Sequence, residues 1–150
     1  MRAHTMYTCA YCGSAKASPS AWCDGGPGSM TPTVRVLVVD DQLVFRDAAR
    51  AVIDATAGFE WIGGARCGEE GVEEAERLRP DLVLMDVRMP GIGGVEAARQ
   101  IASRGLRAIV VLVTAEPPPS HGGGPGTTGE IVPKERLCGA LLRRLWEPYG

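Results

Sequence analysis

The segment Val34-Arg35-Val36-Leu37-Val38-Val39-Asp40-Asp41 decides the fold of this chain. Its first six residues are apolar and mostly β-branched apart from Arg35, which predicts a strand covered on both faces. Two carboxylates follow where that strand ends. Because the carboxyl ends of parallel strands converge on a crevice where ligands bind, the segment predicts an open α/β sheet with a polar site at its edge.

Strand and helix patterns alternate along the rest of the chain. Apolar residues from Phe45 to Thr56 recur at helical spacing, and Gly58 ends that helix. Strands that alternate with helices imply right-handed crossovers and a parallel sheet. Further strands are expected over 59–65, 81–85, 107–113 and 131–133, and further helices over 69–78, 95–103 and 137–145.

The segment from Glu116 to Gly126 interrupts this alternation. It contains three consecutive prolines and four nearby glycines at the place where a helix should cover the sheet. Neither residue type sustains a helix interior, so the fourth helix is expected to be degenerate. Since 116–130 offers few apolar side chains for packing, part of the 109–113 surface is expected to be bare, and signalling through this face to be altered, lost or completed by a partner.

Composition limits the class of protein. A net charge of -2 gives no sign of a nucleic-acid-binding surface. No apolar run approaches the roughly 20 residues that cross a bilayer, and the N-terminus lacks a basic segment followed by an apolar core. A cytoplasmic protein is therefore expected. The five cysteines are an odd number without a disulfide-framework pattern, so reduced thiols are expected.

Three carboxylates and one ammonium are expected to meet at the carboxyl edge of the sheet. Asp86 ends the strand over 81–85 and Lys134 follows the strand over 131–133, just as Asp40 and Asp41 follow the first strand. Such a group of charges makes little sense as packing. Carboxylate oxygens are the ligands that Mg²⁺ prefers, so the set predicts a divalent-cation site with a phosphate beside it.

Four segments carry a resemblance to a known family. Residues 34–147 resemble the receiver domain of bacterial two-component response regulators, and the run 86–99 is similar to receivers of LuxR-type regulators. The resemblance implies a flavodoxin-like (CheY-like), doubly wound, five-stranded parallel sheet with strand order 2-1-3-4-5. The four segments are Val38-Val39-Asp40-Asp41, Leu84-Met85-Asp86-Val87-Arg88-Met89-Pro90-Gly91, Val113-Thr114-Ala115 and Val132-Pro133-Lys134.

The same resemblance implies a phosphoryl-transfer role for four residues. Asp86 would be the phosphoacceptor and would attack the phosphorus of a phosphohistidine or a small acyl phosphate. Thr114 would donate its hydroxyl to a phosphoryl oxygen, and Ala115 would leave space for the donor. Lys134 would pair with the phosphoryl oxygens as a point charge.

Mg²⁺ is the cofactor that this role requires. A dianionic phosphoryl group approaches a pocket of carboxylates, and each like-charge pair at 4 Å costs on the order of 4 kcal/mol at an effective dielectric of about 20. By resemblance, Asp41, Asp86 and the backbone carbonyl of Arg88 would hold Mg²⁺, and Asp40 would act mainly through a bound water. The metal would also bridge the phosphoryl oxygens during transfer.

The chain departs from the family pattern around Lys134. Ile131 stands three positions before the lysine, where many receivers carry an aromatic residue that moves inward when the threonine engages phosphate. Pro133 precedes the lysine and Glu135 follows it, whereas most receivers place proline after it. A proline at this position suits an edge strand, because it cannot donate to a sheet ladder.

Two further positions bear on the lifetime of the phosphoryl group. Arg88 and Glu116 stand two residues beyond Asp86 and Thr114, at positions that tune this lifetime in the family. An Arg88–Glu116 ion pair is expected to shield the acyl phosphate from water, although an exposed pair contributes little stability by itself.

The N-terminal residues 1–33 have no strand or helix periodicity. They are interpreted as a tail that is either disordered or the result of a misassigned translation start, in which case Met30 would be the true start. Cys9, Cys12 and Cys23, with His4 nearby, also permit a zinc site. Without a second Cys-x2-Cys pair, the tail is the preferred interpretation. Residues 148–150 are interpreted as a short C-terminal tail.

The sequence therefore predicts a stand-alone receiver domain that is not an enzyme beyond assisting its own phosphorylation and dephosphorylation. Its partners would be a sensor histidine kinase or phosphotransfer protein and an unknown downstream protein, with a homodimer also open. Since no DNA-binding domain fits after Gly150, output is expected through protein contact. Three alternatives stay open: a degenerate receiver or phosphate sink, an aspartate-dependent phosphatase, and a zinc-tail adaptor with a non-phosphorylated domain.

Overall fold

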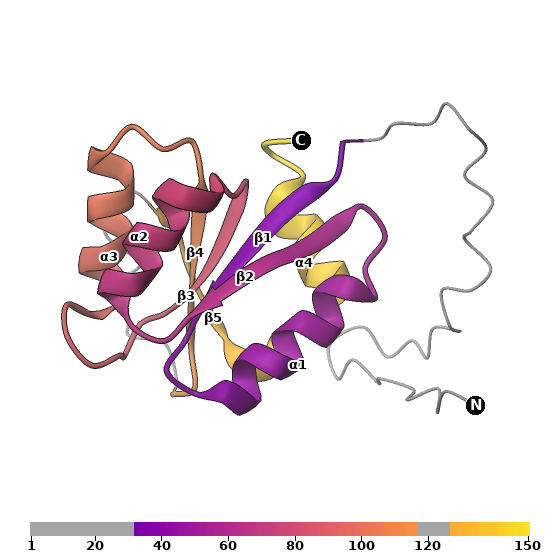
Figure 1. Ribbon diagram of the computed structural model, residues 1–150. Helices are drawn as coiled ribbons and strands as arrows, with labels where there is room; N and C mark the ends of the chain where they lie inside the picture. The colour runs from indigo at the N-terminus through magenta and orange to yellow at the C-terminus, as the bar shows by residue number, and fades with distance from the viewer. Residues whose placement is uncertain (1–31, 117–126) are drawn as a thin grey trace.

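The computed structural model describes residues 32–116 and 127–150 (Figure 1). The predictions for Cys9, Cys12, Cys23 and residues 1–31, and for the part of the Gly/Pro segment over 117–126, lie outside these residues. The strands are β1 (Val34–Val39), β2 (Phe59–Ala65), β3 (Leu82–Asp86), β4 (Ile109–Thr114) and β5 (Thr127–Pro133). The helices are α1 (Leu43–Asp54), α2 (Gly68–Leu78), α3 (Gly93–Ser103) and α4 (Gly139–Trp146), with a short 3-10 helix, η2, over Lys134–Arg136.

The five strands form one sheet in the order β2-β1-β3-β4-β5, and all four strand pairs are parallel. This confirms the predicted flavodoxin-like order. Because every strand runs the same way, all carboxyl ends lie along one edge of the sheet. Pro133 ends β5, which is an edge strand as its proline led us to expect.

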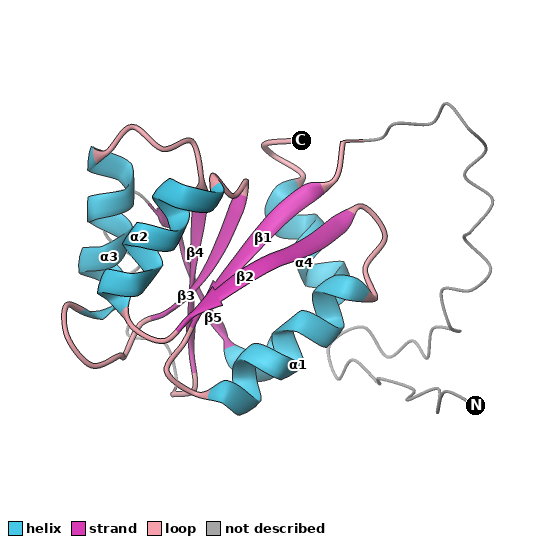
Figure 2. Cartoon of the chain, in the orientation of Figure 1, coloured by secondary structure: helices cyan, strands magenta, loops and turns pink. Residues whose placement is uncertain are grey.

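Helices cover both faces of the sheet and make three layers (Figure 2). On one face α1 and α4 pack against a cluster that includes Val36, Val38, Val111 and Leu142. On the other face α2 and α3 pack against a cluster that includes Leu37 and Leu112. Alternate residues of β1 and β4 thus face opposite layers, which explains why their sequences are apolar almost throughout.

The prediction of a bare surface over 109–113 is wrong. Val110, Val111, Leu112 and Val113 are all at most 1% exposed. The first and third of these side chains pack with α3 and the partly buried Ile131, and the other two pack with α4. Among the described residues, cover for β4 therefore comes from helices that neighbour it in space.

Several boundaries differ from the sequence-based expectation. The first helix ends at Asp54, because the backbone N–H of Thr56 bonds to the carbonyl of Ile53 at 3.0 Å and so leaves the α-helical pattern two residues before Gly58, whose φ is 84°. The fourth strand begins at Ile109 instead of residue 107. The fifth strand is longer than predicted, since pairing with β4 extends it back to Thr127.

Two glycines allow close contacts near the carboxyl edge. Gly94, in the first turn of α3, packs against the carbonyl of Asp86, and a Cβ at this position would collide with it. Gly64 of β2 leaves room for the side chain of Arg46, which lies 3.3 Å from where its Cβ would be. Gly94 thus lets α3 approach the end of β3, and Gly64 lets the Arg46 side chain of α1 lie against β2.

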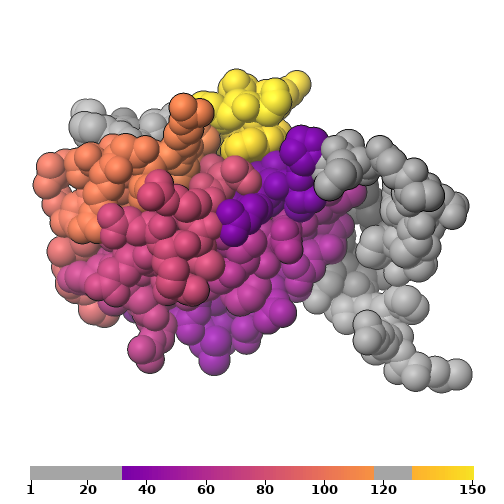
Figure 3. Space-filling view, turned by 45° about the horizontal axis from the view of Figure 1, so that its top comes forward, coloured from indigo at the N-terminus to yellow at the C-terminus, as the bar shows by residue number. Residues whose placement is uncertain are grey.

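The start of β1 lies beside the C-terminal segment: the indigo start of β1 and the yellow C-terminal segment adjoin in the space-filling view (Figure 3). Val34 and Leu142 belong to the same buried cluster, which ties the two ends of the described chain together. Within the described ranges, no helix is both long and apolar enough to cross a membrane.

Candidate functional site

The structure brings the three predicted carboxylates together at the carboxyl edge of the sheet. Asp40 and Asp41 follow β1, and Asp86 is the last residue of the neighbouring β3. One carboxylate oxygen from each lies within 4.8 Å of the other two. Asp40 is fully buried, Asp86 is 5% exposed, and Asp41 is exposed at the rim. Burial of two carboxylates side by side is costly unless a cation compensates their charge.

Local contacts fix Asp40 in place. Its Oδ1 accepts a hydrogen bond of 2.8 Å from the backbone N–H of Gln42, which precedes α1. The guanidinium of Arg46 donates to the backbone carbonyl of Asp40 at 2.6 Å. Arg46 reaches this carbonyl across the space above Gly64. The first turns of α1 therefore hold the end of β1 rigidly beside β3.

Lys134 supplies the positive charge of the site. Its Nζ forms an ion pair with Oδ2 of Asp40 at 2.6 Å and donates a hydrogen bond to Oδ2 of Asp86 at 3.3 Å. Its side chain is only 11% exposed. Burial alone would lower the pKa of Lys134, but its interactions with Asp40 and Asp86 together raise the pKa above its ordinary value. Lys134 thus stays a cation between the two buried carboxylates.

Asp86 is the carboxyl group whose ionisation the site opposes. Burial, followed by the nearby charge of Asp40, raises its pKa above the ordinary value of 3.8. Lys134 and the backbone N–H of Arg88, which donates to Oδ1 at 3.3 Å, act in the opposite direction without cancelling the rise. The ionised form of Asp86 is therefore under-compensated in the protein alone.

This imbalance predicts that Asp86→Asn stabilises the fold in a chelating buffer. Because the folded-state pKa of Asp86 is raised, its ionisation costs stability as pH rises through that pKa, and the cost is absent below the unfolded pKa. We expect the free energy of unfolding of the variant to be about 1 kcal/mol higher than that of the wild type at pH 7. Urea denaturation measures this difference, which should vanish near pH 3. A less stable Asp86→Asn at pH 7 would contradict the assignment of strain to this carboxylate.

Thr114 ends β4 next to Asp86. It is 6% exposed, and its strand pairs with β3 so that Asp86 is registered with Val113. The hydroxyl oxygen of Thr114 accepts a hydrogen bond of 3.2 Å from the N–H of Glu116, which leaves the hydroxyl proton available for another acceptor. Ala115 is exposed beyond it. Asp86 and Thr114, which are predicted to contact the phosphoryl group, are thus the last residues of neighbouring strands.

The predicted Arg88–Glu116 ion pair is present. The guanidinium of Arg88 donates to Oε1 of Glu116 at 2.9 Å, and both side chains are more than half exposed. The pair joins the loop after β3 to the loop after β4, and these two loops carry Asp86 and Thr114. An exposed pair of this kind adds little stability.

The donor set fits Mg²⁺. Mg²⁺ requires oxygen ligands and keeps several of its waters, so a few carboxylates open to solvent on one side suit it. Asp40 and Asp86 offer buried oxygens, and Asp41 offers one at the exposed rim. Within the described part of the chain, one ammonium is paired with two of these three carboxylates, which leaves negative charge for a dication to neutralise.

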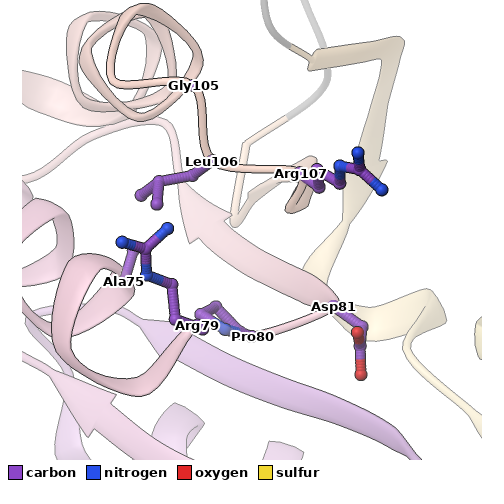
Figure 4. A pocket seen from close by; sticks show the side chains of 7 residues that line it. All are labelled: Ala75, Arg79, Pro80, Asp81, Gly105, Leu106 and Arg107. Carbon is purple, nitrogen blue, oxygen red and sulfur yellow. The ribbon is translucent and has the colours of Figure 1, made fainter.

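A pocket of about 290 Å³ lies at the opposite edge of the sheet, where β3 and β4 begin. In Figure 4 the guanidinium of Arg79 points toward Leu106, whereas Arg107 and Asp81 point away from it. Asp81 accepts a hydrogen bond from the backbone of Arg35 at 2.8 Å. No polar groups converge in this pocket, and the carboxyl edge is therefore the candidate site.

Sequence reasoning missed the contributions of Arg46 and Phe45. The pattern identified Phe45 only as an apolar helix position, but Nζ of Lys134 lies over its ring, 4.8 Å from the centroid. A signal was present, since both residues belong to the first turns of the helix that follows Asp41. Only the direction of their side chains shows that they turn toward the site.

Comparison with known proteins identifies the domain. Residues 36–121 match the family model described as the response regulator receiver domain. The response regulator GacA of Pseudomonas aeruginosa is 41% identical over 87 residues, which cover 57% of this chain and 41% of the relative. The chain thus spans less than half the length of this curated relative.

Solved structures agree with this match. The response regulator domain of Thermotoga maritima CheB superposes with a TM-score of 0.65 at 26% identity and covers 77% of this chain and 95% of that one. A LuxR-family response regulator from Aurantimonas has a TM-score of 0.54 at 30% identity over 57% of this chain and 61% of its own. With its CheY-like sheet and its acidic carboxyl edge, the chain belongs to the response regulator receiver domain family of two-component systems.

Proposed function

We propose that this domain, over residues 34–147, is a phosphoacceptor that takes a phosphoryl group onto Asp86 from a histidine kinase or phosphotransfer protein. The observation that carries the proposal is the cluster of Asp40, Asp41 and Asp86, with the ammonium of Lys134 paired to the first and the last of them. Family membership supports a kinase partner and, with it, a cytoplasmic location. The similarity to a LuxR-family regulator supports the LuxR-type subclass.

Asp41, Asp86 and the backbone carbonyl of Arg88 would hold Mg²⁺, with Asp40 acting through a bound water. When bound, the metal supplies charge neutralisation at the phosphoryl oxygens. A carboxylate oxygen of Asp86 attacks phosphorus, an acyl phosphate bond forms, and the P–N bond of the phosphohistidine breaks. The electron pair of that bond goes to the imidazole nitrogen.

Two further side chains would bind the transferred group. Thr114 would direct its free hydroxyl proton to a phosphoryl oxygen, because its oxygen already accepts from Glu116. Lys134 would move its hydrogen bond from Asp86 to another phosphoryl oxygen, keeping an ammonium next to the new negative charge. Ala115 leaves the approach to Asp86 open to the donor.

Incubation with acetyl phosphate and Mg²⁺, followed by intact mass measurement, tests the proposal. The wild-type chain should gain the mass of one phosphoryl group and lose it again when the acyl phosphate hydrolyses. A chain that gains no phosphoryl group from acetyl phosphate or from a phosphorylated histidine phosphotransfer protein would contradict the proposal.

A degenerate receiver or phosphate sink is the second candidate, and Ile131 favours it. This residue lies on β5, paired with Leu112, at the position where many receivers carry an aromatic residue that couples phosphorylation to output. A phosphate sink would take phosphate on Asp86 while backbone NMR signals of β5 and α4 stay unchanged. A transmitting receiver would change them. An aspartate-dependent phosphatase is disfavoured, since such enzymes carry Asp-x-Asp after the first strand.

Arg88→Ala should shorten the lifetime of the phosphoryl group. Removing the Arg88–Glu116 pair opens a path for water between the loops after β3 and β4, and we expect hydrolysis to accelerate about three- to tenfold. The decay of the phosphorylated mass after removal of the donor measures this rate. Arg99→Ala, which removes an exposed pair with Glu96 on α3, is the matched control and should not change it. An unchanged lifetime in Arg88→Ala would exclude shielding by this pair.

A further inference from the structure

We propose that Phe45 is a positioning residue: its ring holds the ammonium of Lys134 beside Asp40 and Asp86. The inference rests on the proposed function, because it concerns how Lys134 is kept ready for the phosphoryl oxygens. It assigns a role at the site to a residue whose sequence pattern indicates only an apolar position of α1.

Among the residues that the structure describes, three side chains lie close to the ammonium. Nζ of Lys134 lies over the ring of Phe45, 4.8 Å from its centroid, and 2.6 Å and 3.3 Å from the carboxylate oxygens of Asp40 and Asp86. The lysine side chain is 11% exposed. A cation over the face of an aromatic ring is attracted by its quadrupole, and the attraction is stronger where water is excluded. The ring therefore contributes to holding the ammonium at this depth.

The backbone alone does not fix the ammonium. A lysine side chain has four methylene groups, and holding it in one conformation costs rotamer entropy. Lys134 opens η2 immediately after β5, the edge strand of the sheet. A neighbouring rigid side chain helps the two ion pairs to define where its end lies, and Phe45 is held in place by packing against the buried cluster of α1 and α4.

The ring contact has a property that the two ion pairs lack. The positive charge of a bound Mg²⁺ would offset the charges of Asp40 and Asp86, so both ion pairs with Lys134 would weaken. Phe45 is uncharged and offers no metal ligand, so its contact with the ammonium would be unaffected. The ring thus keeps the ammonium near Asp86 while its carboxylate partners change.

The first part of the test is an NMR measurement that needs no phosphorylation. The chain has two lysines, Lys16 and Lys134, so the methylene next to Nζ gives two signals in a lysine-labelled sample, and Lys134→Gln identifies one of them. Protons over a ring face are shifted upfield. We expect this shift for Lys134 in the wild type and in Phe45→Tyr, which keeps the ring, and its loss in Phe45→Leu, which keeps only apolar bulk.

The second part is the rate of phosphorylation by acetyl phosphate with Mg²⁺. Phe45→Leu should lower the rate about five- to tenfold, and Phe45→Tyr should restore it to within about twofold. Phe59→Leu is the matched control: Phe59 is the only other phenylalanine, is partly buried against the same cluster, and lies at the start of β2, away from the site. In a Lys134→Gln background, Phe45→Leu should have no further effect, because it acts through the lysine.

Three results would overturn the inference: an upfield lysine signal that survives Phe45→Leu, an equal loss of rate in Phe59→Leu, or the same loss from Phe45→Leu with and without Lys134. Failure of the proposed function is a different result, namely a wild-type chain that takes no phosphoryl group. In that case the NMR signal alone still decides whether the ring holds the ammonium.

Discussion

Asp86→Ala should abolish the gain of a phosphoryl group that the wild-type chain shows with acetyl phosphate and Mg²⁺. The loss should be complete, because no other side chain of the site combines a carboxylate with the central position between Asp40, Lys134 and Thr114. Asp40 is fully buried with its oxygens engaged by Gln42 and Lys134. Intact mass spectrometry at a series of times measures the phosphorylated fraction.

Asp54→Ala is the control for this experiment. Asp54 is an exposed carboxylate at the end of α1, paired with Arg50, and its removal makes the same change of side chain and charge away from the site. It should be phosphorylated at the wild-type rate. Full phosphorylation of Asp86→Ala would mean that another residue is the acceptor, and the assignment of Asp86 would then be wrong.

Asp41→Asn should raise the Mg²⁺ concentration needed for phosphorylation by on the order of 100-fold. Loss of a direct metal ligand costs at least as much affinity as loss of a residue that hydrogen-bonds to a ligand. Asp41 is the exposed member of the cluster, so the substitution leaves the buried pair and Lys134 intact. The concentration of Mg²⁺ that gives half-maximal phosphorylation measures the effect.

Asp47→Asn makes the matching charge change on an exposed residue of α1 and should leave this concentration unchanged. If both variants respond to Mg²⁺ like the wild type, the carboxylate of Asp41 is not a ligand. If both are weakened equally, the effect arises from net charge and not from coordination.

The sequence predicted the sheet well because buried parallel strands leave a direct signature. The short apolar runs that end at Val39 and Met85 are typical of strands covered on both faces, and the carboxylates that follow them then share an edge of the parallel sheet. This rule places Asp40, Asp41, Asp86 and Lys134 along one edge of the sheet. The strand order implied by the resemblance to receivers then brings the ends of these strands near one another, and the resemblance also adds the roles of the residues.

Elements that depend on neighbours were predicted less well. The start of β5 is polar, and it becomes strand because the backbone of Thr127 pairs with Val110 of β4. The bare surface on β4 was predicted by assigning each strand its own sequential helix, whereas α3, α4 and Ile131 cover it. Propensity is local, and neither effect can be deduced from a local pattern.

The side chains around the site show the same division. The spacing of Phe45 in the helix pattern is that of a core residue, and Arg46 follows it as an ordinary helix surface residue. Their contacts with Lys134 and with the carbonyl of Asp40 depend on side-chain direction and on the space above Gly64. Three-dimensional structure is needed to find such contacts.

The central claim is that a dication must neutralise the acidic edge before Asp86 accepts a phosphoryl group. A titration of the wild-type chain with Mg²⁺, followed by backbone NMR, tests it most directly. We predict saturable shifts at millimolar Mg²⁺ for residues 40, 41 and 86, with no change around Asp81 at the opposite edge. Unshifted signals at residues 40, 41 and 86 throughout the titration would contradict the account.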